Sequence, residues 1–581
     1  MKNIHFILGI ALLLVAFGCS KEILDKKPLD QFSDADFWKD PNLAVVAINQ
    51  LYVYLSPDDA FHEWEGYTNN AIDGILWAPS HSQIQKGWTA GDANYNTRYW
   101  SMDFAIHGAP WDSPFSSLWK IGYREIRDCN IAIKNLTATE NKNERANQLL
   151  AEAKFMRAYQ YFLLTAQFGA VILVDHPLGL NDEVNLPRNT YKECIDFMVK
   201  DLDDAAAILP TSWDATNRGR VTSGTAKALK GRIQLFAERW ADAAATYKSV
   251  IDAGTYSLYP NFQSLFFEEN ENNKEVILDV QYKYPEFIYS GNAQALSGTQ
   301  NGWGAANPTQ NLVDQFELLD GKAWNDPTSI YYDASNPYAN RDKRFYGTVQ
   351  FDQGVYFGKR LETGKGIDGK GNLVKGADVE KNNDVSQTNY YLCKGIDTGG
   401  SLKYNAYTPV PAMGTNVILM RYAEVLLGYA EAKNEATGPD QSVYTAINTV
   451  RSRAGLPDLP GGLSKEQMRA KIHKERRTEL SFEHIYYFDC LRWKDRTNFT
   501  EIPKVVNITY TYGLNADGSV KIDNTSRKVV LSRTFTYPNY TEARTFNLDT
   551  DFGWFFPIPQ EEIDKNPKIV QNGAFQGNIK Q

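Results

Sequence analysis

Residues 225–251 read TAKALKGRIQLFAERWADAAATYKSVI, and this stretch predicts the basic unit of the architecture. In its first half the apolar side chains recur at steps of three and four, as on one face of a helix: Ala226, Leu229, Ile233 and Phe236. A second helical segment over 241–251 follows almost directly, and both segments are rich in alanine. Because small side chains let two helices approach closely, the stretch predicts two antiparallel helices joined by a short link.

The same helical period recurs in five other segments, so we expect a mainly α-helical protein. Their apolar positions run over 118–136, 149–166, 191–205, 418–432 and 444–454. Helix starts near Thr190 and Ser223 lie about one tetratricopeptide (TPR) period apart, roughly 34 residues. Stacked TPR-like helix pairs form a superhelical scaffold with one face free for binding.

Two long regions break the helical pattern and are candidates for the binding face. One covers 57–114, and the other runs from about 256 to 414 and is rich in Gly, Asn, Asp and Tyr. Long loops on a rigid scaffold are where binding groups gather. Within the second region, 359–377 is rich in Gly and Lys and is expected to be a mobile surface loop. Minor β-hairpins are expected from β-like runs at 275–282, 505–511 and 529–531.

The N-terminal residues indicate export. An apolar stretch over 7–17 lies between Lys2 and Gly18-Cys19, and it is shorter than the roughly 20 residues of a spanning helix. The junction resembles a bacterial lipoprotein box, in which cleavage leaves Cys19 as the acylated N-terminus. Ser20-Lys21-Glu22 resembles the surface-export tag of Bacteroidetes lipoproteins. We expect an exported protein tethered by acyl chains, with plain secretion or an uncleaved anchor as the alternatives.

Composition narrows the range of partners. The net charge is -9, the pI is about 5.5 and no basic tract is present, which argues against nucleic acid. No CxxC pair occurs, so we expect buried thiols, with disulfides as the alternative, at Cys129, Cys194, Cys393 and Cys490. No cofactor or metal site is expected, although structural calcium would leave no fixed trace in the sequence.

Several motifs in a fixed order resemble the SusD/RagB family, the surface lipoproteins of Bacteroidetes nutrient-uptake systems. They are LDKKPLD at 24–30, NPTQNLVDQFE at 307–317, MRYAEVLL at 420–427, ERRTEL at 475–480 with DCLRW at 489–493, and PIPQEEI at 557–563. Each motif is modest alone, but their order spans nearly the whole chain. The chain departs from the family pattern at His484 and Tyr486, where the family has Gly and Arg.

The resemblance implies a non-catalytic protein of the outer membrane that faces the cell exterior. Such a protein captures oligosaccharide or polysaccharide and acts as a lid that passes it to a SusC-like TonB-dependent transporter. The chain then divides into a signal peptide over 1–18, TPR-like helix pairs over 19–255 and a loop-rich ligand face over 256–581. Capture of a peptide or another nutrient is the alternative within the family, and a glycoside hydrolase is the enzymatic alternative.

A sugar ring presents an apolar C–H face that suits a flat aromatic ring, and a rim of hydroxyls that suits polar side chains. The two loop regions carry the candidates for stacking, Trp77, Trp88, Trp100, Tyr289, Trp303 and Trp324, and for hydroxyl contacts, Asp73 and Arg98. Core packing is the alternative for any single tryptophan. We expect packing for Trp111, Trp119, Trp240 and Trp493.

Two further motifs suggest chemistry that we do not expect. Glu475 and Glu479 beside Arg477 resemble a catalytic carboxylate pair, but charged helices commonly pair such residues internally. The segment GKGIDGKG at 364–371 approaches a phosphate-binding loop, but Gly371 stands where a hydroxyl is needed. We expect a structural helix at the first motif and a flexible surface loop at the second.

Overall fold

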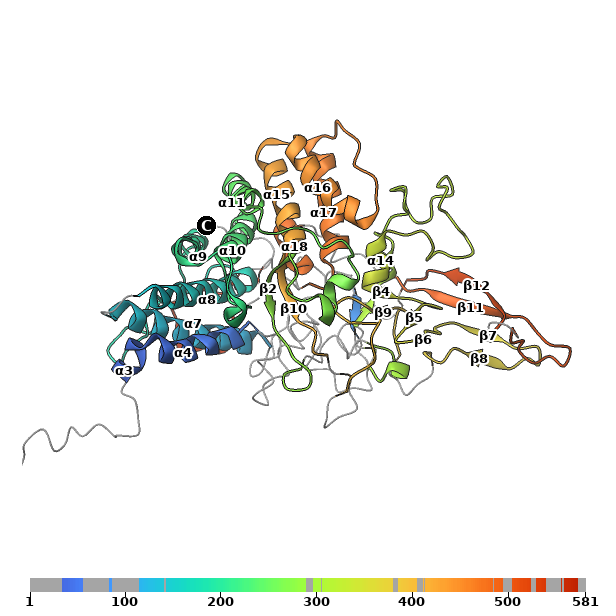
Figure 1. Ribbon diagram of the computed structural model, residues 1–581, viewed down its shortest axis with the longest axis horizontal. Coiled ribbons are helices and arrows are strands. Elements are labelled where there is room, and N and C mark those ends of the chain that lie inside the picture. Colours follow the sequence, from blue (N-terminus) through green and yellow to red (C-terminus); the bar gives the residue numbers. More distant parts are fainter. Residues whose placement is uncertain are drawn as a thin grey trace, which may run out of the picture.

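The structure is a computed structural model, and it describes residues 34–55, 83–85, 114–139, 143–288, 296–302, 304, 306–379, 385–404, 411, 413–483, 485–494, 504–523, 529–539, 555 and 558–572. Helices fill one end of the elongated molecule, a two-stranded ribbon crosses its middle, and a four-stranded sheet projects from the opposite end (Figure 1).

Most of the helices form one continuous array, in which neighbours along the chain pack against each other (Figure 1). The first group consists of α3 (Asp34–Lys39), α4 (Pro41–Val53), α7 (Pro114–Ala138), α8 (Glu144–Phe168), α9 (Tyr191–Ile208), α10 (Ser223–Phe236) and α11 (Trp240–Asp252). The second group consists of α15 (Tyr422–Thr437), α16 (Gln441–Ala454) and α17 (Lys465–Leu480). It continues the first because α11 packs against α15. The predicted mainly α-helical architecture is confirmed.

Local sequence signals set the ends of these helices. At the start of α9, the Thr190 hydroxyl accepts a hydrogen bond from Glu193 N–H, and the Glu193 carboxylate accepts one from Thr190 N–H. Helices α15 and α16 end at Gly438 and Gly455, whose φ angles of 82° and 81° lie in the left-handed region that glycine adopts without strain.

Small residues allow three helices to close around one tyrosine. Tyr247 of α11 is 1% exposed. A Cβ atom added at Gly231 of α10 or at Gly428 of α15 would lie 2.7 Å from its ring. The predicted close approach of the 225–251 helix pair therefore depends on a glycine as well as on alanines.

The strands are short and link distant segments. Antiparallel pairs join β2 (Val276–Val280) to β10 (Val417–Arg421), β4 (Val349–Gln350) to β9 (Tyr391–Leu392), and β5 (Val355–Tyr356) to β6 (Lys359–Arg360). The projecting sheet has the order β12 (Leu531–Thr536), β11 (Asn507–Tyr512), β7 (Lys365–Ile367), β8 (Leu373–Lys375). The shorter helices are α13 (Gln310–Val313), α14 (Lys343–Thr348), α18 (Tyr486–Trp493) and α20 (Gln560–Lys565).

Two sequence expectations are corrected here. Ile418 lies in β10 and not in a helix, because the apolar run before α15 pairs with β2. The 359–377 segment contains β6, β7 and β8 and is not a structureless loop. Its glycines serve close strand packing, since a Cβ added at Gly366 would lie 2.2 Å from the Tyr510 carbonyl oxygen.

The cysteine expectation is confirmed, because all four cysteines after Cys19 are buried free thiols. Burial raises the pKa of Cys393 to about 12, which keeps that thiol protonated. In the described ranges, no helix combines the length and the apolar character needed to cross a membrane.

Candidate functional site

The C-terminal half of the charged helix α17 is buried and forms ion pairs with several other elements. Glu479 is fully buried and pairs with arginines from three other elements: Arg344 of α14, Arg421 of β10 and Arg453 of α16. Burial raises the pKa of Glu479, but these arginines outweigh burial and hold it well below its usual range. A glycosidase acid needs a raised pKa, so this carboxylate fits a structural role. The prediction that the helix pairs its charges internally is wrong, because the C-terminal half of α17 is buried and its charged side chains pair with neighbouring elements.

The structure brings the two predicted loop regions together. Strand β1 (Gln83–Gln85) comes from the first region and pairs antiparallel with β3 (Ala306–Pro308) from the second. Gln85 lies opposite Ala306 at one end of this ladder. In the sequence, Trp88 follows Gln85 by three residues and Trp303 precedes Ala306 by three. Most predicted site residues lie outside the described residues: Asp73, Trp77, Trp88, Arg98, Trp100, Tyr289 and Trp303.

The motif NPTQNLVDQFE holds the base of the second loop region in place. Its buried amides accept three hydrogen bonds from two distant segments, 387–390 and the segment that begins at Lys504. The side-chain oxygens of Asn307, Gln310 and Asn311 accept from Gln387 N–H (2.9 Å), Tyr390 O–H (2.6 Å) and Lys504 N–H (2.6 Å), respectively. A satisfied buried polar network rigidifies its surroundings, so β3 is a firm base for the residues on either side of it.

Trp324 is the only predicted stacking residue in the described part of the chain. It is half-buried, and its ring contacts Tyr537 edge-to-face at 5.1 Å. The Arg341 guanidinium lies 5.7 Å from the ring centre. These contacts favour the packing alternative, and stacking of Trp324 on a sugar stays a prediction. Trp119, for which packing was expected, is 3% exposed.

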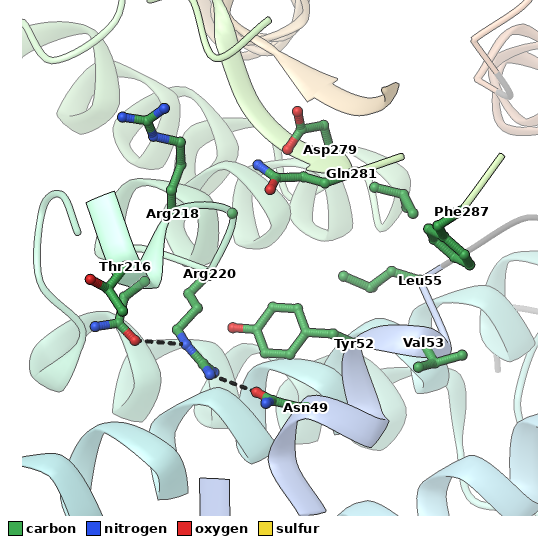
Figure 2. A pocket seen from close by; sticks show the side chains of 13 residues that line it. Asn49, Tyr52, Val53, Leu55, Thr216, Arg218, Arg220, Asp279, Gln281 and Phe287 are labelled. Carbon is green, nitrogen blue, oxygen red and sulfur yellow. Dashed lines mark hydrogen bonds between the residues drawn. The ribbon is translucent and has the colours of Figure 1, made fainter. Parts of the chain in front are cut away.

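A pocket of about 300 Å³ opens between α4, the loop around the 3₁₀ turn η3 (Ala215–Asn217) and the end of β2 (Figure 2). Its apolar lining includes Val53, Leu55 and Phe287. Its polar lining includes Asn49, Thr216, Asn217, Arg220, Asp279 and Gln281. Leu55 is the last described residue before the first predicted loop region, and Phe287 belongs to the second, so the pocket residues adjoin both regions along the chain.

Glu152 of α8 is fully buried behind one wall of the pocket and holds the side chains of that wall in place. Its carboxylate accepts hydrogen bonds from Tyr52 Oη (2.8 Å), from Arg220 (2.7 Å) and from Arg145 (2.9 Å). Arg220 also donates to Asn49 Oδ1 at 2.6 Å, and its guanidinium lies 5.5 Å from the Tyr52 ring centre. In Figure 2, Tyr52 stands between Arg220 and the apolar side of the pocket. Arg220 is therefore held by an ion pair with Glu152 and a hydrogen bond to Asn49, which fixes its position in the wall.

The opposite side of the pocket carries an exposed aromatic ring. Phe287 is 48% exposed and stacks on Tyr282, with ring centres 4.9 Å apart and planes 9° from parallel. Tyr282 is 5% exposed and fixes the Phe287 ring from the core side. A half-exposed ring with a rigid backing is suited to stacking on the apolar face of a sugar.

Asn416 connects two acidic side chains beside this ring. Its side chain donates to Asp279 Oδ2 at 2.8 Å, and its oxygen accepts from Tyr282 N–H at 2.9 Å. Its backbone N–H donates to Glu271 at 2.7 Å. Burial raises the pKa of Asp279 and raises that of Glu271 to about 7. Both carboxyls therefore bind protons more tightly than exposed ones. No three His, Cys, Asp or Glu side chains gather as a metal site within the described ranges.

Comparison with known proteins identifies the family. A model of the SusD family matches residues 265–575, which is more than half of the chain. The chain belongs to the SusD family. A second model, described as starch-binding and associating with the outer membrane, matches residues 48–235.

Relatives of this SusD-family chain cover nearly its whole length. It is 24% identical to a SusD-like protein of Bacteroides ovatus over 98% of this chain and 97% of that protein. A solved SusD-like protein from Bacteroides fragilis has a TM-score of 0.73 at 28% identity and covers 95% of this chain and 100% of its own. A second B. fragilis structure, titled a SusD-like carbohydrate-binding protein, has a TM-score of 0.69 at 23% identity, covers 92% of this chain and 100% of its own, and shows the shared fold.

Sequence analysis of this SusD-family chain missed the described pocket residues. Tyr52 lies in a helix for which no binding role was predicted, and Phe287 lies two residues before the predicted Tyr289 without a motif of its own. The signal available in the sequence was the aromatic-rich run after β2, which holds Tyr282, Tyr284, Phe287 and Tyr289 within eight residues.

Proposed function

We propose that this SusD-family chain captures glycan with the pocket between α4 and β2. The observation that carries the proposal is Phe287, a half-exposed aromatic ring fixed by Tyr282 at the edge of the pocket. The polar lining of the pocket holds amides, a hydroxyl and the charged side chains of Arg218, Arg220 and Asp279. An aromatic face with hydrogen-bonding groups opposite it matches the two surfaces of a sugar ring.

The family supports this proposal. One matching model is described as starch-binding, and one solved relative is titled a carbohydrate-binding protein. Carbohydrate binding is therefore supported at the level of the family. The glycan class bound by this chain is the part that we propose to determine by experiment.

We also propose that the chain is anchored through an acylated Cys19 and faces outward. There it would deliver its glycan to a SusC-like TonB-dependent transporter without cleaving it. The support is the Gly18-Cys19 junction in the sequence and the family model's association with the outer membrane. No cofactor enters this proposal.

Affinity electrophoresis of the mature chain from residue 20 tests the capture role. Gels would contain starch, xylan, laminarin, pectin or mucin glycans. We expect one glycan class to retard the protein, and Phe287→Ala to weaken that retention about tenfold or more, as for a central aromatic contact. Tyr332→Ala is the matched control, since Tyr332 is 37% exposed and is not among the pocket residues.

The outcomes separate the alternatives. Retention that Phe287→Ala leaves unchanged would place the glycan site elsewhere on the molecule. If none of the five glycans retards the protein, the peptide-capture alternative gains support. Hydrolysis of any glycan by the purified chain would contradict the non-catalytic role.

A further inference from the structure

Asp279 places a buried carboxyl group in the wall of the pocket. It lies in β2, is 8% exposed and lines the pocket together with Gln281, which follows the strand. Figure 2 shows the two side chains next to each other on the β2 side of the pocket. Burial of a carboxylate costs free energy unless its charge is paired or hydrogen-bonded, so the partners of Asp279 decide what this group can do.

The partners of Asp279 differ from those of the buried carboxylates in the structural ion pairs. Glu479 and Glu152 are each paired with arginines. Burial raises the pKa of Asp279, and the side chains that oppose this shift are the amides of Asn416 and Gln281, with no cation from the described residues among them. A carboxylate can accept about four hydrogen bonds, so Asp279 retains acceptor capacity for a ligand.

One amide fixes this acceptor relative to the exposed aromatic ring. Asn416 donates to Asp279 Oδ2 at 2.8 Å and accepts from Tyr282 N–H at 2.9 Å. The Tyr282 ring in turn stacks on Phe287, with ring centres 4.9 Å apart. The acceptor and the ring are therefore held in a fixed relation, which lowers the cost of ordering them around a bound sugar.

The charged groups around Asp279 and its neighbour Glu271 come from several segments. They are Glu268 and Lys403 beside Glu271, Glu271 on the backbone N–H of Asn416, and Arg218 and Arg220 in the pocket lining, with Glu152 behind Arg220. Lys403 pairs with Glu268 and Arg220 with Glu152, while Arg218 is exposed.

The other elements that face Asp279 add no group that titrates near neutral pH. Helix α4 contributes Asn49, Val53 and Tyr52, whose hydroxyl pKa is raised well above its usual value by burial. Strand β10 places Ile418 opposite Asp279. Asp279 and Glu271 are therefore the carboxyl groups at this side of the pocket that burial shifts toward neutral pH.

We propose that the Asp279 carboxylate accepts hydrogen bonds from the bound sugar, so that the chain holds its glycan at neutral pH and releases it in acid. This inference rests on the proposed glycan capture and assigns a further binding residue to that site. Hydroxyl groups that donate to the carboxylate stabilise its ionised form, so binding to the protonated form displaces a proton into solvent. The affinity is then highest above the pKa of Asp279 and falls as the pH drops through it.

The test is isothermal titration calorimetry of the mature chain with a neutral oligosaccharide from the polysaccharide that retards it. The oligosaccharide is maltoheptaose for starch, xylohexaose for xylan or laminarihexaose for laminarin. We expect the affinity to fall about tenfold between about pH 7.5 and 4.5, the contribution of a hydrogen bond to a charged group. Titrations at about pH 5 in two buffers of different ionisation enthalpy should show proton release on binding.

Two variants assign this pH dependence to one carboxyl group. Asp279→Asn keeps the shape of the side chain but cannot ionise, and circular dichroism checks that it folds. It should bind about tenfold more weakly than the parent at about pH 7.5, with an affinity that changes less than about twofold with pH. Glu271→Gln is the matched control, because it removes the neighbouring carboxyl and should retain the loss of affinity in acid.

The outcomes separate this inference from glycan capture itself. A parent whose affinity is independent of pH, or an Asp279→Asn variant with the parent's pH profile, would overturn the role of Asp279 and leave glycan capture intact. Loss of the pH dependence in Glu271→Gln would overturn it as well. If Asp279→Asn fails to fold, absence of proton release by the parent would overturn the proposal. Absence of binding to any polysaccharide would overturn both proposals together.

Pectin and mucin glycans carry charges of their own and need a different comparison. If one of them is the retained glycan, affinity electrophoresis over the same pH range replaces calorimetry. The difference between the parent and Asp279→Asn then removes the titration of the glycan, and retention that falls equally in both would overturn the role of Asp279.

Discussion

At the scale of the residue, Glu152 shows how one buried carboxylate shapes the pocket. It accepts from Tyr52, Arg145 and Arg220, so its removal leaves buried donors unpaired. We expect Glu152→Gln to lower the free energy of unfolding by about 3 kcal/mol, as for the loss of one partner of a buried pair. Urea denaturation followed by circular dichroism measures this loss. Glu144→Gln on the same helix is the control, because Glu144 is exposed and should change stability by less than about 0.5 kcal/mol. Equal effects of the two variants would contradict this role of Glu152.

At the scale of the element, the helix array depends on positions without side chains. The Tyr247 ring lies between Gly231 and Gly428, so it has no room to move away from an added methyl group. We expect Gly428→Ala to destabilise the fold by about 1–3 kcal/mol through overpacking, despite the better helix propensity of alanine. Thermal unfolding measures the effect. Gly461→Ala is the matched control, because its added Cβ meets nothing within 4 Å. A Gly428→Ala variant as stable as the parent would show that α11 and α15 can separate.

At the scale of the whole molecule, buried ion pairs join elements from different parts of the chain. Burial raises the pKa of Glu431, but Arg492 and Arg476 outweigh burial and lower it to about 2. The pKa values of Glu479 and Glu483 are also lowered against the effect of burial, by arginines at Glu479 and by Arg421 and Lys394 at Glu483. A lowered carboxyl pKa adds stability that is complete above the unfolded pKa of 4.5 and is lost as the pH falls through the folded pKa. We therefore expect the steepest fall in Tm between about pH 4.5 and 2.

Calorimetric scans across this pH range measure that dependence, and Glu431→Gln should make the acid limb shallower. The pKa shift of Glu271 has the opposite sign, because burial raises its pKa to about 7 and so favours protonation of this carboxyl in the folded state. Its contribution to stability falls as the pH rises from 4.5 to 7, and Glu271→Gln should remove that part. A Tm that stays constant down to about pH 3 would contradict the role assigned to the buried carboxylates.

The sequence by itself determined the features that depend on near neighbours. The period of three and four residues predicted α7 to α11, with one helix start near Thr190, and the ordered motifs identified the family. Only the tertiary structure decided that 359–377 contains strands, which residues pair with the charges of α17, and where the pocket lies. The pocket joins side chains from α4, the residue 216–220 loop and β2, and no local period relates such distant positions. Whether an aromatic residue such as Phe287 is exposed or buried is likewise set by what packs behind it, which here is Tyr282.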